Sequence, residues 1–240
     1  MNWKGHTIFS IIFGLPFLMA PEQIFLLIAG ALYPDLDHDV KTNIVNRGIL
    51  LSSLLILISV MTFLLDLFTN SSNFNINMLV AGVLIFLVYL IPANSKHRGF
   101  THTIYCMILC STIIGYYTFQ LSFLTPLVVG LLALLMTTTK KLFKQIIPIG
   151  LIIMIIVYSF NIKIGLLNYN GALYYIIPVM LGYLSHIVAD SFTPAGVKAL
   201  EPFNSYKFKR FEGIIIMIIW LIIVVFLINS NYNIFNNGII

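Results

Sequence analysis

Long apolar stretches alternate with short polar segments along this chain. Each stretch has about 14 to 21 residues, enough for a helix to cross all or most of a hydrocarbon core of ~30 Å. We therefore predict about seven transmembrane helices, which cover residues 48–68, 78–91, 103–119, 124–139, 146–160, 172–192 and 214–228. Thr193, Pro194 and Gly196 mark the end of the sixth of them.

The first apolar region, residues 7–33, departs from this pattern because Pro16, Pro21 and Glu22 interrupt it. Each half has only about a dozen residues, which form ~18 Å of helix and cannot cross the membrane alone. We predict a re-entrant helical hairpin, with Pro21 at the start of its second arm. A single bent span is the alternative.

Composition supports an integral membrane protein. Of the 240 residues, 60% are hydrophobic and 9% are charged, and the mean hydropathy is +1.00. An ordinary soluble domain is about half apolar and a quarter charged, so that class is excluded. Neither an internal repeat nor a polar linker divides the chain. We predict an all-α, polytopic membrane protein with a single domain over residues 1–240.

The basic residues orient the predicted helices. Threading the spans back and forth places every lysine and arginine except Lys163 on one side. Cytoplasmic loops carry such an excess, so this side should face the cytoplasm. The same bias explains the net charge of +5 without nucleic acid as a partner. The threading requires a hairpin in the first region, because a single span would put His6 on the far face. We predict a multi-pass protein of the inner (plasma) membrane.

Cys106 and Cys110 are the two cysteines of the chain, four residues apart in an apolar run. That spacing puts them on one face of a helix, where a thiol pair could form. We interpret them instead as small residues of the buried core. They give no evidence for a disulfide or for a cysteine-bound zinc.

Histidines and aspartates gather on the same predicted face. All five histidines thread to it, and aspartates from two segments join them. These residues are His6, Asp35, Asp37, His38, Asp39, His97, His102, His186 and Asp190. Ionisable side chains are costly beside a bilayer and usually mark a functional site. Their convergence on one boundary therefore favours a functional site, which we place on the cytoplasmic side.

Two patterns within this set are typical of metal ligands. His186 and Asp190 are four residues apart and share a helix face, although a hydrogen-bonded pair has the same spacing. Asp35, Asp37 and His38 combine hard oxygens with a borderline nitrogen, as in sites for Zn²⁺, Mn²⁺ or Fe²⁺. A solvated acidic loop would have the same composition.

The polar segment between the second and third predicted spans concentrates positive charge. His97 and His102 flank Gly99, which we expect to allow a tight turn at the start of a helix. Lys96 and Arg98 would either contact a substrate or extend along the membrane surface to reach water.

Four short motifs supply the polar residues of this face. They are Gly5-His6, Pro34-Asp35-Leu36-Asp37-His38, His97-Arg98-Gly99-Phe100-Thr101-His102-Thr103, and Gly182-Tyr183-Leu184-Ser185-His186 with Asp190, Thr193 and Gly196. Their order and positions, over residues 5–203, resemble those of the YdjM-like family of inner-membrane, metal-dependent hydrolases. The resemblance implies a helical membrane protein with a His/Asp metal site and hydrolase activity. It also suggests a distant kinship with zinc-dependent phospholipase C and P1-type nucleases, although the chain lacks a further His-x-x-x-Glu ligand set.

A cluster of imidazoles and carboxylates can bind one or two divalent ions, which activate water and polarise an ester. We predict a membrane-bound hydrolase with zinc as the expected ion and manganese or iron as alternatives. The predicted metal ligands are His6, Asp37, His38, His97, His102, His186 and Asp190. Asp35 is the predicted general base or bridging ligand, and Arg98 and Lys96 would hold a phosphate or its transition-state charge. The position at the bilayer boundary favours a membrane lipid or a lipid-linked phosphoester or other ester.

Two other functions would use the same residues. A divalent metal transporter would place ionisable residues near the bilayer midplane on broken helices, whereas the mid-span residues here are apolar. A non-catalytic protein with a structural metal would usually close its site with four ligands, often cysteines. Both remain alternatives, and the sequence leaves the oligomeric state open.

Overall fold

The computed structural model describes residues 3–38, 42–69, 72–121, 125–159, 166 and 169–236. Helices dominate this part of the chain, which contains no β-sheet and a single isolated bridge between Val197 and Phe208. The α-helices are α1 (Trp3–Gly14), α2 (Gln23–Leu32), α3 (Thr42–Thr69), α4 (Ile76–Asn94), α5 (Ile104–Gln120), α6 (Pro126–Thr137), α7 (Lys140–Ser159), α8 (Leu173–Ser191) and α9 (Arg210–Asn236). Short 3₁₀ helices are η1 (Leu15–Phe17), η2 (Pro34–Asp37) and η4 (Phe100–His102).

Five of the described helices are long and apolar enough to cross a membrane, namely α3, α4, α7, α8 and α9. The other two predicted spans correspond to the shorter apolar helices α5 and α6, whose 17 and 12 residues form ~26 and ~18 Å of helix. The prediction of an all-α, polytopic membrane protein is confirmed. Several helices extend beyond the predicted spans, among them α3, which begins at Thr42, and α9, which ends at Asn236. Helix α7 begins at Lys140 and so includes the lysines that precede the span predicted over residues 146–160. Lysine is a good helix former, so the helix begins in the polar residues that precede the apolar stretch.

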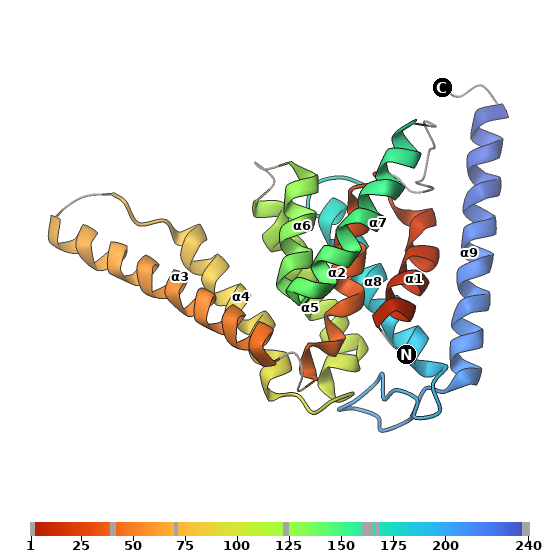
Figure 1. Ribbon diagram of the computed structural model, residues 1–240, viewed down its shortest axis with the longest axis horizontal. Coiled ribbons are helices and arrows are strands. Elements are labelled where there is room, and N and C mark those ends of the chain that lie inside the picture. Colours follow the sequence, from red (N-terminus) through yellow and green to blue (C-terminus); the bar gives the residue numbers. More distant parts are fainter. Residues whose placement is uncertain are drawn as a thin grey trace.

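The first apolar region folds as a helical hairpin. After α1 the chain reverses through η1, and α2 then runs back along α1 (Figure 1). The two ends of the hairpin meet where His6 and Asp35 offer ligand atoms within 4.8 Å of each other. A single bent span would place these two residues on opposite sides of a membrane, so the structure favours the hairpin over that alternative.

Helix α2 lies at the centre of the bundle, and every one of its residues is buried. Helix α8 packs closely along it because both helices carry a glycine at the contact. A Cβ at Gly30 would lie 2.1 Å from the carbonyl oxygen of Val179, and one at Gly182 would lie 1.9 Å from that of Leu27. Small residues permit such close approach of helices in membrane proteins. The lack of a side chain at Gly182 therefore allows α8, which carries the fourth motif, to pack directly against α2.

Two parts of the molecule stand away from this bundle. Helices α3 and α4 form a hairpin that projects from one side, and α9 lies along the other side (Figure 1). Large apolar side chains on these helices are exposed, including Leu50, Leu57 and Phe226. Apolar surface of this extent marks contact with a membrane or a partner, and on membrane-spanning helices it fits contact with lipid. Cys106 and Cys110 are buried in α5, as predicted for core residues.

The predicted polar segments meet at one end of the bundle. Helices α2, α4, α6 and α8 end there, and α1, α5 and α7 begin there (Figure 1). Residues from the first, second and third motifs, from the start of α7 and from the end of α8 line one cavity at this end. Asp39, Lys41 and Lys163, which also entered the threading, lie outside the described residues.

We predict that this end faces the cytoplasm. Single cysteines at Asn43 and Ser205, which are exposed near the site end, should resist a membrane-impermeant thiol reagent in intact cells. A cysteine at Asn73, in the turn between α3 and α4, should react. The background would be a protein without Cys106 and Cys110. Labelling of Asn43 and Ser205 from opposite sides would contradict the threading.

Candidate metal centre

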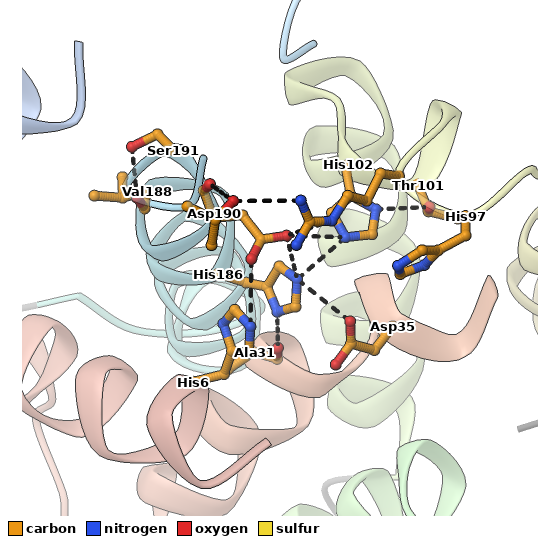
Figure 2. Close-up of polar contacts among 12 residues, drawn as sticks. His6, Ala31, Asp35, His97, Thr101, His102, His186, Val188, Asp190 and Ser191 are labelled. Carbon is orange, nitrogen blue, oxygen red and sulfur yellow. Dashed lines mark hydrogen bonds and ion pairs between the residues drawn. The ribbon is translucent and has the colours of Figure 1, made fainter. Parts of the chain in front are cut away.

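Side chains from four separate segments converge on the centre of this end (Figure 2). Helix α1 supplies His6, η2 supplies Asp35, and η4 supplies His102. The last two turns of α8 supply His186 and Asp190, which project from one helix face toward the other three (Figure 2). The i, i+4 spacing thus places both side chains on one face of α8, as predicted from the sequence.

Three potential ligand atoms, from His102, His186 and Asp190, face one another, and an oxygen of Asp35 lies beside the His186 nitrogen. Nε2 of His186 lies 3.2 Å from Nε2 of His102. Oδ2 of Asp190 lies 3.5 Å from the His102 nitrogen and 3.7 Å from the His186 nitrogen. Oδ1 of Asp35 lies 3.7 Å from the same His186 nitrogen. Two ligands of a tetrahedral zinc, each at ~2.1 Å, are ~3.4 Å apart, so these separations match those of a zinc site.

The second ring nitrogen of His186 and of His102 lies beside a hydrogen-bond acceptor, which fixes the ring proton on that nitrogen. Nδ1 of His186 lies 2.7 Å from the carbonyl oxygen of Ala31, so this nitrogen is the donor. Nδ1 of His102 lies 3.1 Å from Thr101 Oγ1 and 3.5 Å from Oδ2 of Asp37, so we assign its proton in the same way. Both Nε2 atoms then present lone pairs to the carboxylates. Buried acceptors that face one another are unfavourable unless a cation lies between them, so the residues fit a divalent metal.

His6 extends the cluster on one side. Its ring stacks on that of His186, with centroids 3.9 Å apart, and its Nε2 lies 3.5 Å from Oδ1 of Asp190. Its buried Nδ1 has no hydrogen-bond partner among the described residues. Two groups of three possible ligands result, and they share His186. One consists of His6, Asp35 and His186, and the other of His102, His186 and Asp190. The arrangement is compatible with one or two ions.

Asp37 lies behind these atoms and holds the third motif in place. It accepts hydrogen bonds from Nδ1 of His97, the backbone N–H of Arg98 and the hydroxyl of Thr101. Burial raises the pKa of Asp37, but hydrogen bonds from His102, Thr101 and His97 outweigh burial and lower the pKa below its ordinary value. The carboxylate is therefore ionised at neutral pH. Its position is that of a residue that orients a ligating histidine.

The tight turn that we expected at Gly99 is present and leads into η4. Gly99 donates its N–H to the carbonyl of Lys96 over 2.7 Å, but the left-handed residue is Arg98, with φ of +59°. A Cβ at Gly99 would lie 2.8 Å from that carbonyl oxygen, so glycine is needed for close approach. A non-glycine residue in this conformation costs on the order of 1–3 kcal/mol. The guanidinium is thereby held near α8, with Nε 3.7 Å from Oδ2 of Asp190 and Nη1 3.3 Å from Thr193 Oγ1.

A cavity of about 490 Å³ lies beside the facing atoms. Its lining includes His6, Asp35, Arg98 and Asp190 from the centre and Lys141 from α7. Such a volume is within the range of about 300–1,000 Å³ for small-molecule sites. A substrate in this cavity would therefore touch both the possible metal ligands and two cations.

The remaining predicted residues lie at the edge of the site. His38 and His97 are exposed and line the cavity, and their rings are 5.0 Å apart. Neither belongs to the groups of possible ligands found among the described residues. Lys96 is exposed and does not line the cavity.

Comparison with known proteins bears on this arrangement. The model of a family described as YdjM inner membrane protein matches residues 1–140 and 142–238. The chain belongs to the YdjM inner membrane protein family. Neither the curated proteins nor the solved structures contain a match. The more distant kinship with zinc-dependent phospholipase C and P1-type nucleases therefore stays a prediction.

Three features of the site in this YdjM-family chain were not predicted from the sequence. Thr101 lies inside the third motif, and its hydroxyl joins Asp37 to His102. Thr193 positions the guanidinium of Arg98, and the Ala31 carbonyl fixes the proton of His186. The two threonines stand within or beside recognised motifs, so their position was a usable signal. A backbone carbonyl carries no sequence signal.

Proposed function

We propose that this protein is a membrane-bound, metal-dependent hydrolase that cleaves a phosphoester or another ester of a lipid-linked substrate. The observation that carries the proposal is the facing set formed by Nε2 of His102, Nε2 of His186 and Oδ2 of Asp190. These atoms are buried, and the proton-bearing Nδ1 atoms of the two imidazole rings point away from them. Asp190 also lines the adjoining cavity. Structural zinc sites are usually closed by protein ligands, whereas catalytic ones keep a position for water or substrate.

Each residue has a distinct part in this proposal. His102, His186 and Asp190 would hold the ion, with His6 and Asp35 available to a second ion or to the same one. A bound divalent ion lowers the pKa of water toward neutrality and polarises the scissile group. Asp35, partly exposed in the cavity wall, is placed to accept a proton from the attacking water. Asp37, which we listed among the ligands on sequence grounds, would instead orient His102.

Positive charge in the cavity supports a phosphoester over an uncharged ester. The guanidinium of Arg98 lies beside the facing set, with its Nε 3.7 Å from Oδ2 of Asp190. A guanidinium can hold phosphate oxygens in a two-pronged contact. Lys141 lines the same cavity, whereas Lys96 does not, so we place Lys141 in the phosphate-binding role predicted for Lys96.

The transporter alternative has less support from the described helices. His186 and Asp190 lie in the last two turns of α8, at the end of the span, and not at its middle. A transport site would be expected near the bilayer midplane on interrupted helices. The polar cluster lies instead at the end of this span, where a water-soluble co-reactant would be available.

Removal and return of metal would test the proposal. Protein purified after growth with Zn²⁺, Mn²⁺ or Fe²⁺ should contain roughly one to two equivalents of metal, the range for a single or paired hydrolytic site. Chelation should reduce hydrolysis of a generic phosphomonoester or phosphodiester to background, and the returned ion should restore it. A protein that stays metal-free after supplementation, or hydrolysis that survives complete chelation, would overturn the proposal.

A further inference from the structure

A second cavity, of about 960 Å³, lies between the projecting α3–α4 hairpin and helix α6. Helix α3 lines it with one face, at residues three and four apart. That face includes Ile44, Gly48, Leu51, Leu55 and Ile58. Leu132, Leu135 and Met136 of α6 form the opposite wall. We call this cavity the α3–α6 groove.

The floor of the groove is a defined part of the fold. The ring of Tyr89, from α4, reaches across to α6, and its hydroxyl donates to the carbonyl of Met136 over 2.8 Å. The same ring lies against Gly48, where a Cβ would come within 2.3 Å of it. The groove is therefore closed below by packed side chains and is more than a gap between two helices.

The length of the groove suits a hydrocarbon chain. Its lining on α3 runs from Asn43 to Ile58, which corresponds to ~22 Å of helix. One leaflet of a bilayer has a hydrocarbon depth of ~15 Å, half of the ~30 Å core. Because α3 is long and apolar enough to span a membrane, the apolar part of the groove would lie at the depth of lipid tails.

Positive charge marks the polar end of the groove. Arg47 and Lys141 line it there, and both are exposed. Neither has an ion-pair partner among the described residues, and no acidic residue of that part of the chain lines the groove. An anionic headgroup would supply the missing counter-charge at the level where a lipid headgroup lies.

The groove borders two other cavities, with which it shares lining residues. Thr139 and Lys141 line both the groove and the cavity of the candidate metal centre. Ile85, Tyr117 and Leu132 line both the groove and an inner apolar cavity of about 150 Å³. A chain seated in the groove would thus have its head beside the metal centre.

We propose that the α3–α6 groove binds one hydrocarbon tail of an anionic lipid and presents its phosphate headgroup to the metal centre. Arg47 and Lys141 would contact the phosphate, and the face of α3 through Leu51 and Leu55 would contact the tail. The inference names the substrate class of the proposed hydrolase and in that respect rests on the proposed function. The binding itself does not require catalysis and can be measured alone.

Photocrosslinking in vesicles would test the tail-binding site. The probe is a phospholipid with a phosphomonoester headgroup and a diazirine in one acyl chain, present as a minor component of phosphatidylcholine vesicles. Crosslinks should map to the groove face of α3 and to Leu135 and Met136. Leu51→Trp should lower crosslinking about tenfold, equivalent to ~1.4 kcal/mol of binding.

Leu50→Trp is the matched control, because Leu50 neighbours Leu51 and is equally exposed, at 60% against 61%, but does not line the groove. It should crosslink like the wild type. Equal labelling of both faces of α3, unaffected by Leu51→Trp, would show only the lipid that surrounds any membrane helix and would overturn the inference. Covalent dimers formed through this face by a separate bifunctional crosslinker would assign the groove to a second copy and would also overturn the inference.

The preference of the site for an anionic headgroup can be measured in the same vesicles. The phosphomonoester probe should outcompete an uncharged diacylglycerol probe and a zwitterionic choline probe of the same tail. Arg47→Gln and Lys141→Gln should each reduce that preference roughly tenfold, the loss of one charge-assisted contact. Lys144→Gln is the control, because Lys144 is exposed on α7 but lines neither cavity. Soluble inorganic phosphate that competes as well as the lipid would show that the cations bind a free anion and not a lipid.

A hydrolysis assay separates this inference from the proposed function. The ratio of long-chain lipid phosphate to soluble phosphoester hydrolysis should fall in Leu51→Trp and stay unchanged in Leu50→Trp. Specific groove labelling without hydrolysis would support the lipid site and contradict the hydrolase. Metal-dependent hydrolysis without specific groove labelling would support the hydrolase and contradict the lipid site.

Discussion

Asp190→Asn should deprive the purified protein of most of its metal while the helical fold is retained. Oδ2 of Asp190 lies 3.5 Å from Nε2 of His102 and 3.7 Å from Nε2 of His186, and the side chain is 3% exposed. An asparagine has nearly the same shape but no charge, and its carbonyl oxygen is a poorer ligand for a dication. Loss of a residue that only supports a ligand costs about 10–100-fold in metal affinity, so loss of this ligand should cost more.

The measurement is bound metal per protein by elemental analysis, with elution profile and circular dichroism as tests of folding. Asp37→Asn should show the smaller, supporting effect, because Asp37 contacts His102 at its far nitrogen. His38→Ala is the control at the edge of the cavity and should keep its metal. The assignment of the facing set would be wrong if His38→Ala lost metal and Asp190→Asn did not.

The helical architecture was readable from the sequence because membrane spans must be long and apolar. The start of α7 shows the limit of that reading. Lys140 and Lys141 are polar, so an apolar window begins after them, yet the backbone is already helical. Hydropathy reports where a helix enters lipid and not where its hydrogen bonds begin. The consequence is functional, because Lys141 lines both the metal cavity and the groove.

The convergence of the site was also predictable, because it depends only on which side each polar segment reaches. The facing atoms were not, because they depend on helix rotation and turn geometry. His38 directly follows η2 yet is exposed, whereas His6 stacks on His186 inside the bundle. Asp35 faces His186, while Asp37, two residues later, accepts a hydrogen bond from His97 and holds the third motif. Spacing in the sequence did not distinguish these pairs.

The conformation of Arg98 is the clearest case where local rules were insufficient. Glycine is the usual residue at positive φ, and Gly99 stands next to it. The structure places the strain on the arginine, with its N–H bonded to Asp37 and its guanidinium near Asp190 and Thr193. Strained backbone that is held by surrounding contacts is found frequently at functional sites. The observation motivates a test of the side chain itself.

Arg98→Ala should leave bound metal near the wild-type level while hydrolysis of a phosphoester falls roughly ten- to a hundred-fold. The guanidinium lies beside the facing set without belonging to it, so its removal takes no ligand away. A lost charge-assisted contact to a phosphate oxygen costs about 1.5–3 kcal/mol, which corresponds to that range. Arg98→Lys should recover only part of the rate, because an ammonium cannot make the planar two-pronged contact.

Arg98→Gly separates the side chain from the backbone. It removes the same guanidinium as Arg98→Ala but adopts the left-handed conformation at φ of +59° without strain. If the guanidinium contacts the substrate, the glycine and alanine variants should lose the same activity. Recovery in Arg98→Gly alone would make the alanine defect a matter of turn geometry.

If Arg98 only anchors the turn at the membrane surface, Arg98→Lys should restore full activity, since a lysine reaches water equally well. Joint loss of metal and activity in all three variants would instead make Arg98 a structural support for Asp190, which its Nε approaches to 3.7 Å.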